Sequence, residues 1–177
     1  DGTYGIQTIK GFCGTDKTES GSSIYSNKAV SNNGKWEIET ITDFQFLVDA
    51  DGVHIGQDDL PVAEVRRLLG PSKIIGLSTH GPEQAAAAVE AGADYIGVGP
   101  IYATQTKEDV CAPVGLGYLD WVAANIRLPF VAIGGIKEHN IAEVTAHGAH
   151  CCALVSELVG AEDIAAKVGA VRAAMQR

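Results

Sequence analysis

The chain has 177 residues, of which 46% are hydrophobic, and its 13 basic and 22 acidic side chains give a formal net charge of −9. This length and composition suit one domain with a sizeable core, and the acidic balance argues against a nucleic-acid partner. The sequence contains no apolar run of transmembrane length and no signal-peptide pattern at its amino terminus. We therefore expect a cytoplasmic protein without a membrane partner.

Residues 1–43 differ in composition from the rest of the chain. Most of this segment is rich in Gly, Ser, Thr and Asn, although "TYGIQTIKGF" (3–12) and "KWEIETIT" (35–42) have the β-branched and aromatic residues of strands. We expect residues 13–35 to be irregular, because they offer too little apolar surface to offset the entropy of ordering. Residues 1–43 are thus a divergent segment, and residues 44–177 are the regular part of a single domain.

From residue 44 onward, short apolar runs alternate with helix-like segments. The predicted strands are 51–56, 73–78, 94–99, 129–135 and 151–156, and the helices predicted to follow them are 58–70, 81–92, 115–126, 138–148 and 161–175. In the first helix Asp59 is placed to act as the cap, Pro61 suits the first turn, and Gly70 suits the end. The strands are apolar without alternation, which is typical of parallel strands covered by helices.

Strict alternation of strands and helices predicts an α/β fold, either a doubly wound sheet or a (β/α)₈ TIM barrel. No G-x-G-x-x-G motif opens a helix, which disfavours a dinucleotide-binding sheet. We expect the last five βα units of a TIM barrel, parallel and with right-handed crossovers. Three more units of the same size do not fit before Asp51, so the amino-terminal part of such a barrel is divergent or incomplete.

In a parallel barrel, the loops that follow the strands form the functional site. The predicted loops contain "GQDD" (56–59), "STH" (78–80), "TQTK" (104–107), "GG" (134–135) and "VS" (155–156). Gly134 and Gly135 allow backbone N–H groups to approach a phosphate, and a helix after Ser156 adds its positive end. The alternative is that these glycines only allow the chain to turn. The second loop of this kind, at 155–156, favours a phosphate-binding site.

Other polar residues in these loops are less specific. Asp58 and Asp59 have the chemistry of a Mg²⁺ site, although such a pair is also common at helix caps. His80 is ambiguous because it lies next to Ser78, and Thr and Lys side chains in a loop are often only solvated. The remaining histidines are expected to be structural or solvated: His54, His139, His147 and His150.

The cysteines do not indicate a metal site or a disulfide framework. Their spacing fits neither, and the four residues are Cys13, Cys111, Cys151 and Cys152. Two adjacent residues of a strand face opposite sides, so Cys151 and Cys152 cannot ligate one metal together. Reduced thiols agree with the expected cytoplasmic location.

Five motifs stand out in residues 44–177: "DADGVHIGQDDLP", "LGPSKIIGLSTH", "AGADYIGVGPIYATQTK", "FVAIGGI" and "ALVSEL". In this combination they resemble the thiamine phosphate synthase family, whose members are (β/α)₈ enzymes. The resemblance implies a transferase of thiamine biosynthesis, with hydroxymethylpyrimidine diphosphate and a thiazole phosphate as small-molecule substrates. The diphosphate leaves as pyrophosphate, and the thiazole nitrogen captures the resulting pyrimidine cation.

The resemblance also implies roles for individual residues. Asp59 matches a ligand of the cofactor Mg²⁺, Ser78 matches a contact to the pyrimidine or the leaving group, and Lys107 matches a phosphate-binding cation. Ser78 and Lys107 are therefore the candidate catalytic residues. The candidate substrate-binding residues are Thr104, Thr106 and Lys107 in one loop and Gly135, Val155 and Ser156 at the thiazole phosphate site.

Two motifs of the family are not matched. The family has a Gln-x-Arg-x-Lys motif, whereas "GIQTIKGF" (5–12) has Gln and Lys in another pattern. The family also has Asn-Asp-Arg, whose Asp is the second Mg²⁺ ligand, and the matching positions here are Glu39, Thr40 and Ile41. We expect the leaving-group end of the site to be depleted and the chain to turn over slowly or not at all.

Three alternatives to an active synthase are compatible with parts of the sequence. The first is a non-catalytic protein of the same family that binds thiazole phosphate or phosphate, and the second is another phosphate-binding barrel enzyme such as an isomerase. The third, a thiazole tautomerase, is disfavoured because this chain has Pro100 in place of the tautomerase histidine and retains the T-x-T-K loop. The sequence is compatible with a homo-oligomer but does not determine the oligomeric state.

Overall fold

A computed structural model describes residues 31–32, 35–36, 50–106 and 111–176 of the chain. In the amino-terminal segment, β1 (Ser31–Asn32) and β2 (Lys35–Trp36) pair antiparallel. The strand predicted from Lys35 is thus confirmed for two residues, and the expectation of irregular structure over 13–35 is wrong for Ser31–Asn32 and for Lys35. The strand predicted at 3–12 and the rest of the irregular segment lie outside the described residues.

The main body is a five-stranded parallel sheet in the order β3-β4-β5-β6-β7. Its strands are β3 (Gly52–Ile55), β4 (Ile74–Thr79), β5 (Tyr95–Val98), β6 (Phe130–Ile133) and β7 (Cys152–Ala153). The helices are α2 (Val62–Leu69), α3 (Pro82–Glu90), α4 (Gly115–Asn125), α5 (Ile141–Ala146), α6 (Ser156–Val159) and α7 (Ile164–Ala174). Because neighbours in the sheet are also neighbours in the sequence, the five predicted parallel βα units are confirmed.

Two local predictions are corrected by the structure. Asp59 does not cap α2, which follows Pro61 without a side-chain cap; the Asp59 carboxylate instead accepts the N–H of Gly56 at 2.6 Å and closes the loop after β3. Gly70 ends α2 with a φ of 80°, as predicted. β7 is shorter than the predicted 151–156, because in the described sheet it pairs only with β6, and α6 begins already at Ser156.

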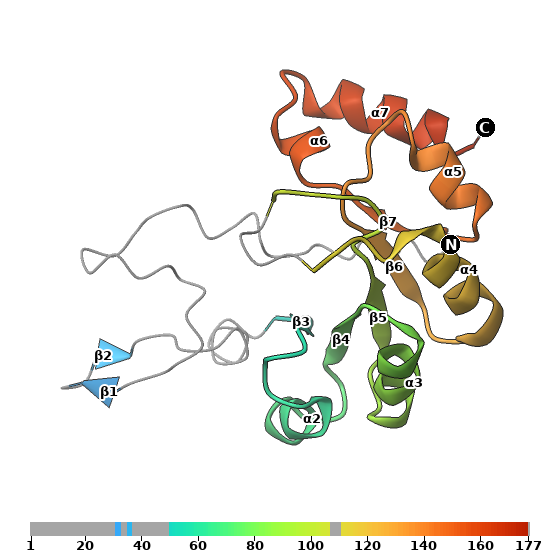
Figure 1. Ribbon diagram of the computed structural model, residues 1–177. Coiled ribbons are helices and arrows are strands. Elements are labelled where there is room, and N and C mark those ends of the chain that lie inside the picture. Colours follow the sequence, from blue (N-terminus) through green and yellow to red (C-terminus); the bar gives the residue numbers. More distant parts are fainter. Residues whose placement is uncertain (1–30, 33–34, 37–49, 107–110, 177) are drawn as a thin grey trace.

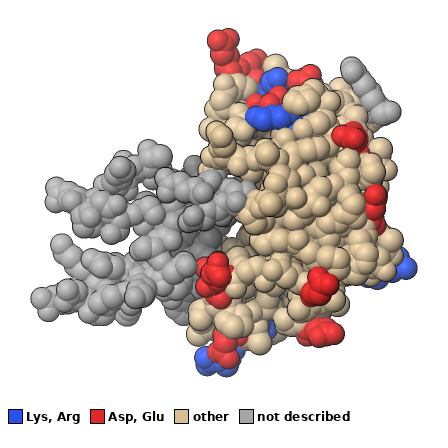
Figure 2. Space-filling view, in the orientation of Figure 1, with Lys and Arg blue, Asp and Glu red and all other residues tan. Residues whose placement is uncertain are grey.

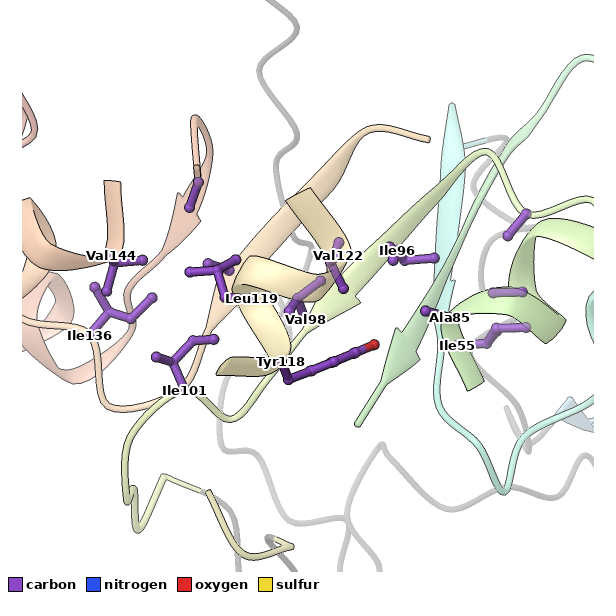
Figure 3. Close-up of a cluster of buried hydrophobic side chains, with 14 of the residues drawn as sticks. Ile55, Ala85, Ile96, Val98, Ile101, Tyr118, Leu119, Val122, Ile136 and Val144 are labelled. Atoms are coloured by element: carbon purple, nitrogen blue, oxygen red, sulfur yellow. The ribbon is translucent and has the colours of Figure 1, made fainter. Parts of the chain in front are cut away.

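The helices lie along one side of the curved sheet (Figure 1), and the core fills the space between the two layers. The strands contribute Val53, Ile55, Ile75, Ile96, Val98 and Ala132, and the helices contribute Val62, Val65, Ala85, Ala88, Leu119, Val122, Ile141 and Val144. Figure 3 shows Leu119 and Val122 of α4 beside Val98 and Ile96 of β5. β5, the central strand, is buried along its whole length, as expected for a parallel strand.

The described helices do not include one that is long and apolar enough to cross a membrane. Acidic side chains are spread over much of the visible surface (Figure 2). Acidic and basic side chains lie together at the lower end, near α2, and also at the end of the molecule that carries α6 and α7. The mixed cluster at α6 and α7 lies near the loops that follow β6 and β7, so it bears on the functional site.

Candidate active site

Each described candidate residue lies at or just beyond the carboxyl end of a strand. Asp59 follows β3, Ser78 is near the end of β4, Thr104 and Thr106 follow β5, Gly135 follows β6, and Val155 and Ser156 follow β7. Since the strands are parallel, these ends share one edge of the sheet, which is where active sites form in such folds. The structure therefore brings these candidates to one edge, while Lys107 lies outside the described residues.

Three side chains form a hydrogen-bonded chain across β3, β4 and β5, on the face of the sheet opposite the helices, which we call the inner face. His54 Nε2 lies 2.8 Å from Ser78 Oγ, and His54 Nδ1 lies 2.9 Å from the Tyr95 hydroxyl oxygen. Burial, and to a smaller extent Cys151, raises the pKa of Tyr95 to about 12, so its hydroxyl stays neutral at physiological pH. The ring of His54 thus fixes the position of the Ser78 hydroxyl.

Glycines make room for this chain of side chains. A Cβ atom at Gly76 would overlap the ring of Tyr95, and a Cβ atom at Gly97 would lie 3.2 Å from His54 Cε1. The sheet register places His54 beside Gly76, two residues before Ser78 on the same face of β4. His54 was expected to be structural or solvated, and its contact with a candidate catalytic residue was missed because the register between strands cannot be read from one strand alone.

Asp59 provides a carboxylate in the loop after β3, the strand that pairs with Ser78's strand β4. Beside it in the loop, the Gln57 side chain donates to the main-chain oxygen of Ser78 at 2.6 Å. A recess of about 400 Å³ lies between this loop and helices α2 and α3; Gln57 and Asp59 contribute to its lining, but Ser78 does not. The described residues include no group of three or more His, Cys, Asp or Glu side chains that could hold a metal. A single carboxylate suits Mg²⁺ when substrate phosphate oxygens and water complete the coordination.

The loop after β5 is built against the loop after β6. The N–H groups of Ile101 and Tyr102 donate to the oxygens of Ile133 and Gly134 at 2.9 and 3.0 Å. Gly135 has a φ of 64°, and a Cβ atom there would lie 2.6 Å from the oxygen of Ala103. Gly135 is therefore required for close packing of two loops, whatever it also contributes to phosphate binding.

The side chains of the threonine loop are oriented toward one another. Thr104 Oγ1 lies 3.0 Å from Thr106 Oγ1 and accepts the N–H of Thr106 at 3.4 Å.

Two histidines make contacts elsewhere. His80 Nδ1 lies 2.5 Å from the oxygen of Gly99; because a carbonyl only accepts, this nitrogen carries the hydrogen. His147 pairs with Asp120 at 2.6 Å, between α5 and α4.

At the β6–β7 end, Lys137 connects the two candidate phosphate loops. Its Nζ donates to Ser156 Oγ at 2.8 Å and lies 3.4 Å from the Glu157 carboxylate. Its N–H donates to Asn140 Oδ1 at 2.7 Å, and the Asn140 amide donates in turn to the oxygen of Gly135 at 3.1 Å. Sequence reasoning did not single out Lys137, although its position two residues after Gly135 was a visible signal.

Glu157 is the shared acceptor of this cluster. Burial alone would raise the pKa of Glu157, but the N–H of Glu138 and the ammonium groups of Lys137 and Lys167 together lower it. Lys167 donates to Glu138 at 2.9 Å and to Glu157 at 3.5 Å. The two lysines and two carboxylates thus form a connected cluster of ion pairs.

Comparison with known proteins decides the family. Residues 33–158 match the sequence model of a family described as "Thiamine monophosphate synthase". The chain belongs to the thiamine monophosphate synthase family. This confirms the resemblance seen in the sequence motifs.

Relatives of this thiamine monophosphate synthase family share much of the sequence. The chain is 69% identical over 135 residues to a thiamine-phosphate synthase of Pelotomaculum thermopropionicum, covering 76% of this chain and 62% of that protein. It is 62% identical over 133 residues to one of Lawsonia intracellularis, covering 75% and 61%. The chain thus spans less than two thirds of the length of these relatives.

A solved structure of the family supports the fold. A thiamine phosphate pyrophosphorylase from Pyrococcus furiosus superposes with a TM-score of 0.68 at 34% identity, covering 76% of this chain and 64% of that chain. A 3-hexulose-6-phosphate synthase superposes with a TM-score of 0.53 at 24% identity and shares the fold alone. The five parallel βα units therefore have the TIM-barrel-like arrangement of this family.

Proposed function

We propose that this chain acts in thiamine biosynthesis, by joining hydroxymethylpyrimidine diphosphate to a thiazole phosphate with release of pyrophosphate. The observation that carries the proposal is the convergence of the described candidate residues at one edge of the sheet, in a chain of this family. The proposal includes phosphate binding, Mg²⁺ as cofactor, small-molecule substrates and a cytoplasmic location.

The proposed reaction breaks one bond and forms one. The C–O bond between the pyrimidine methylene and the diphosphate breaks, and its electron pair leaves with pyrophosphate. The lone pair of the thiazole nitrogen then forms a C–N bond to the methylene carbon, and the positive charge moves to the thiazolium ring. The site must therefore stabilise a departing polyanion and hold two substrates in line, which are electrostatic and positional tasks.

The residues of the inner face suit the pyrimidine and leaving-group end. Ser78 is half-buried and held by His54, so its hydroxyl can contact a substrate without a large loss of rotamer freedom. Asp59 would hold Mg²⁺ there, and when bound the ion would neutralise part of the leaving group's charge. Lys107 is proposed as a further cation for the same leaving group.

The loops after β5, β6 and β7 suit the phosphate of the second substrate. Thr104, Thr106 and Ser156 offer hydroxyl donors, and Gly135 and Val155, in the loops after β6 and β7, offer main-chain groups. Ser156 is exposed at the surface of this end of the molecule. We assign this end to the thiazole phosphate.

We also infer that the 177-residue chain turns over slowly. Glu39, Thr40 and Ile41 stand where the family has Asn-Asp-Arg, and the Gln-x-Arg-x-Lys pattern is not matched. Removing one preorganised stabiliser of a transition-state charge typically costs about 10²–10³ in rate. Several such groups of the family are unmatched here, and they would all act on the same leaving group, so the losses of rate are not expected to add.

Binding and turnover must be measured separately to test this proposal. Calorimetry with thiazole phosphate should show binding to the full 177-residue chain, and Mg²⁺ should strengthen the binding of hydroxymethylpyrimidine diphosphate. A pyrophosphate-release assay with both substrates should then show slow turnover that is still above the rate without the protein. A rate of about one per second or more would show that other residues rebuild the leaving-group site. A chain that binds neither substrate would contradict the proposed function.

Binding without any turnover would instead match the non-catalytic alternative. The matched variants Asp59→Asn and Asp58→Asn separate the metal role from general charge loss. We expect Asp59→Asn to weaken the Mg²⁺-dependent part of diphosphate binding about ten-fold or more, since a metal ligand is lost. Asp58→Asn, which removes the same charge one residue away, should have a much smaller effect.

A further inference from the structure

The β6–β7 end of the site contains a cation that the family resemblance leaves without a role. Lys137 lies two residues after Gly135, and its side chain is 31% exposed. Its Nζ atom contacts the Ser156 hydroxyl oxygen at 2.8 Å, so it joins the two loops assigned to the thiazole phosphate. A lysine in this position can change what those loops bind.

The chemistry of the Lys137–Ser156 contact favours an anion. An ammonium group has three donors and no acceptor, so the Ser156 oxygen must accept this hydrogen bond. The hydroxyl hydrogen of Ser156 is then directed to another acceptor. An oxyanion beside Ser156 can therefore receive the hydroxyl hydrogen of Ser156 and an N–H of Lys137, and both bonds are charge-assisted.

The backbone of Lys137 is anchored, which fixes where its side chain starts. The Lys137 N–H donates to Asn140 Oδ1 at 2.7 Å, and Asn140 Nδ2 donates to the oxygen of Gly135 at 3.1 Å. The same asparagine thus holds both the glycine loop and the lysine. A phosphate in this loop would meet a cation whose backbone is already in place, which lowers the entropy lost on binding.

The other lysine of the cluster is engaged differently. Lys167 donates to the carboxylates of Glu138 and Glu157 at 2.9 and 3.5 Å, and these contacts raise its pKa. Lys137 divides its ammonium between the Ser156 hydroxyl at 2.8 Å and the Glu157 carboxylate at 3.4 Å. The contact to Glu157 is the longer one, so a phosphate can compete for Lys137 while Lys167 continues to neutralise the two glutamates.

The charge pattern also indicates on which side the anion binds. A hollow of about 430 Å³ between α5, α6 and α7 is lined in part by Glu138 and Glu157. Two carboxylates in its wall disfavour a phosphate there. The Ser156 side of Lys137 is therefore the side where an anion is favoured.

We propose that Lys137 is a substrate-binding residue, which together with Ser156 holds the phosphate monoester group of the second substrate. The identity of that substrate as a thiazole phosphate rests on the function proposed above, but the binding of phosphate by Lys137 and Ser156 does not. Lys137 supplies a positive charge where the main-chain groups of Gly135 and Val155 supply only dipoles. Its loss should weaken binding of the phosphate group and leave binding of the heterocycle unaffected.

Calorimetry on the full chain with three probes tests this assignment: inorganic phosphate, thiazole phosphate, and the corresponding thiazole alcohol without phosphate. Lys137→Met keeps the length of the side chain and removes the charge, whereas Lys137→Arg retains the charge. Lys167→Met is the matched control, because it removes a lysine of the same cluster that donates to carboxylates. Thermal unfolding of each variant checks that the chain is folded.

We expect Lys137→Met to weaken inorganic phosphate and thiazole phosphate about ten-fold or more, the usual range for a hydrogen bond to a charged group. Lys137→Arg should restore most of that affinity. The thiazole alcohol should bind equally to all variants, and Lys167→Met should change phosphate affinity by less than about two-fold. Raising the salt concentration should weaken phosphate binding by the wild type more than by Lys137→Met.

The three probes separate failure of this assignment from failure of the proposed function. Equal phosphate affinity in the wild type and in Lys137→Met would overturn the role of Lys137, and so would an absence of phosphate binding in the wild type. Lys137-dependent phosphate binding without any gain from the thiazole ring would support the role of Lys137 and contradict the proposed substrate. Loss of affinity for the alcohol in Lys137→Met would show a structural effect and would also overturn the assignment.

Discussion

The two faces of the sheet differ in almost every property. The face toward the helices carries Ile75, Ile96 and Val98, each 0% exposed, and packs against apolar helix residues. The inner face carries the hydrogen-bonded side chains of His54, Ser78 and Tyr95 among glycines. The same strands therefore supply both layers, because alternate residues point in opposite directions.

The difference assigns stability to one face and chemistry to the other. At the end of the sheet that carries the site, even large apolar side chains add little buried area: Ile133 and Val155, near the carboxyl ends of β6 and β7, are 39% and 44% exposed. A protein that placed only apolar residues on both faces would have no donors for a substrate. Polar side chains between glycines supply such donors, and the buried helix-facing layer supplies the free energy to keep them in position.

Adjacent isoleucines on β4 give the sharpest test of this difference. Ile75 is 0% exposed and Ile74 is 43% exposed. We expect Ile75→Ala to lower the free energy of unfolding by about 2–5 kcal/mol through lost burial and a cavity. Ile74→Ala should cost about 1 kcal/mol or less, because much of its side chain is already in water. Urea unfolding followed by tryptophan fluorescence measures both, and equal costs would show that the inner face is covered.

A pair of glycines tests the packing of the inner face itself. Gly76→Ala places a methyl group in the ring of Tyr95, so we expect a loss of about 1–3 kcal/mol from overpacking. Gly117→Ala in α4 has no neighbour within 4 Å and should stabilise the helix by about 0.5–1 kcal/mol. Circular dichroism melting curves measure both changes in stability. If Gly76→Ala stabilised the protein as Gly117→Ala does, Tyr95 would not occupy the space above Gly76.

Tyr95→Phe tests the hydrogen-bonded chain with a smaller expected effect. Loss of the hydroxyl should cost about 1 kcal/mol and should change the ¹⁵N chemical shifts of the His54 ring, because Nδ1 loses a partner at 2.9 Å. The double variant of His54→Asn and Tyr95→Phe should lose less stability than the sum of the two single variants, since the two residues share one chain of contacts. Unchanged His54 shifts in Tyr95→Phe would show that the contact does not form in solution.

The Tyr95→Phe variant also tests how stability changes with pH, and the direction of that change follows from the pKa of Tyr95. The pKa of Tyr95 rises from its ordinary value of 10.0 to about 12 in the folded protein, first through burial and then through Cys151. The stability gained is therefore complete below pH 10 and is lost as the pH rises from 10 to about 12. We expect the melting temperature of Tyr95→Phe to fall less over this window than that of the wild type.

Glu157→Gln should have the smallest effect, at the exposed end of the site. Contacts with the Glu138 N–H and the ammonium groups of Lys137 and Lys167 outweigh burial and lower the pKa of Glu157 below 4.5. Its contribution to stability is present above pH 4.5 and is lost as the pH falls below that value. Melting curves of wild type and Glu157→Gln should converge at low pH; a constant difference would exclude this titration.

Much of the fold could be predicted from the sequence, because its signals are local. The strand at Tyr95–Val98 is a short apolar run between glycines, and Gly70 marks the end of α2. The loops with Asp59, Ser78 and Ser156 were predicted because parallel strands bring their ends together. One error arose where the same residue type serves two local structures. The Asp59 carboxylate closes its own loop instead of capping α2.

The contacts between candidate residues could not be predicted. The bond between His54 and Ser78 depends on the register of two strands, and the bond between Lys137 and Ser156 depends on how closely two loops approach. Both are set by packing of the whole sheet, which no single segment encodes. The roles of all the candidate site residues, from Asp59 and Ser78 to Lys107 and Ser156, remain predictions.

The contact between the loops after β5 and β6 has a consequence for the thermodynamics of binding. The Tyr102 N–H donates to the oxygen of Gly134, and Gly135 leaves no room for a side chain against Ala103. A ligand that stiffens either loop therefore also stiffens the other, so the entropy of ordering both is lost once instead of twice. Lys107 in the loop after β5 is proposed for the diphosphate, and Gly135 in the loop after β6 for the thiazole phosphate. We therefore expect the two substrates to bind with positive cooperativity, with each raising the affinity of the other by the same factor.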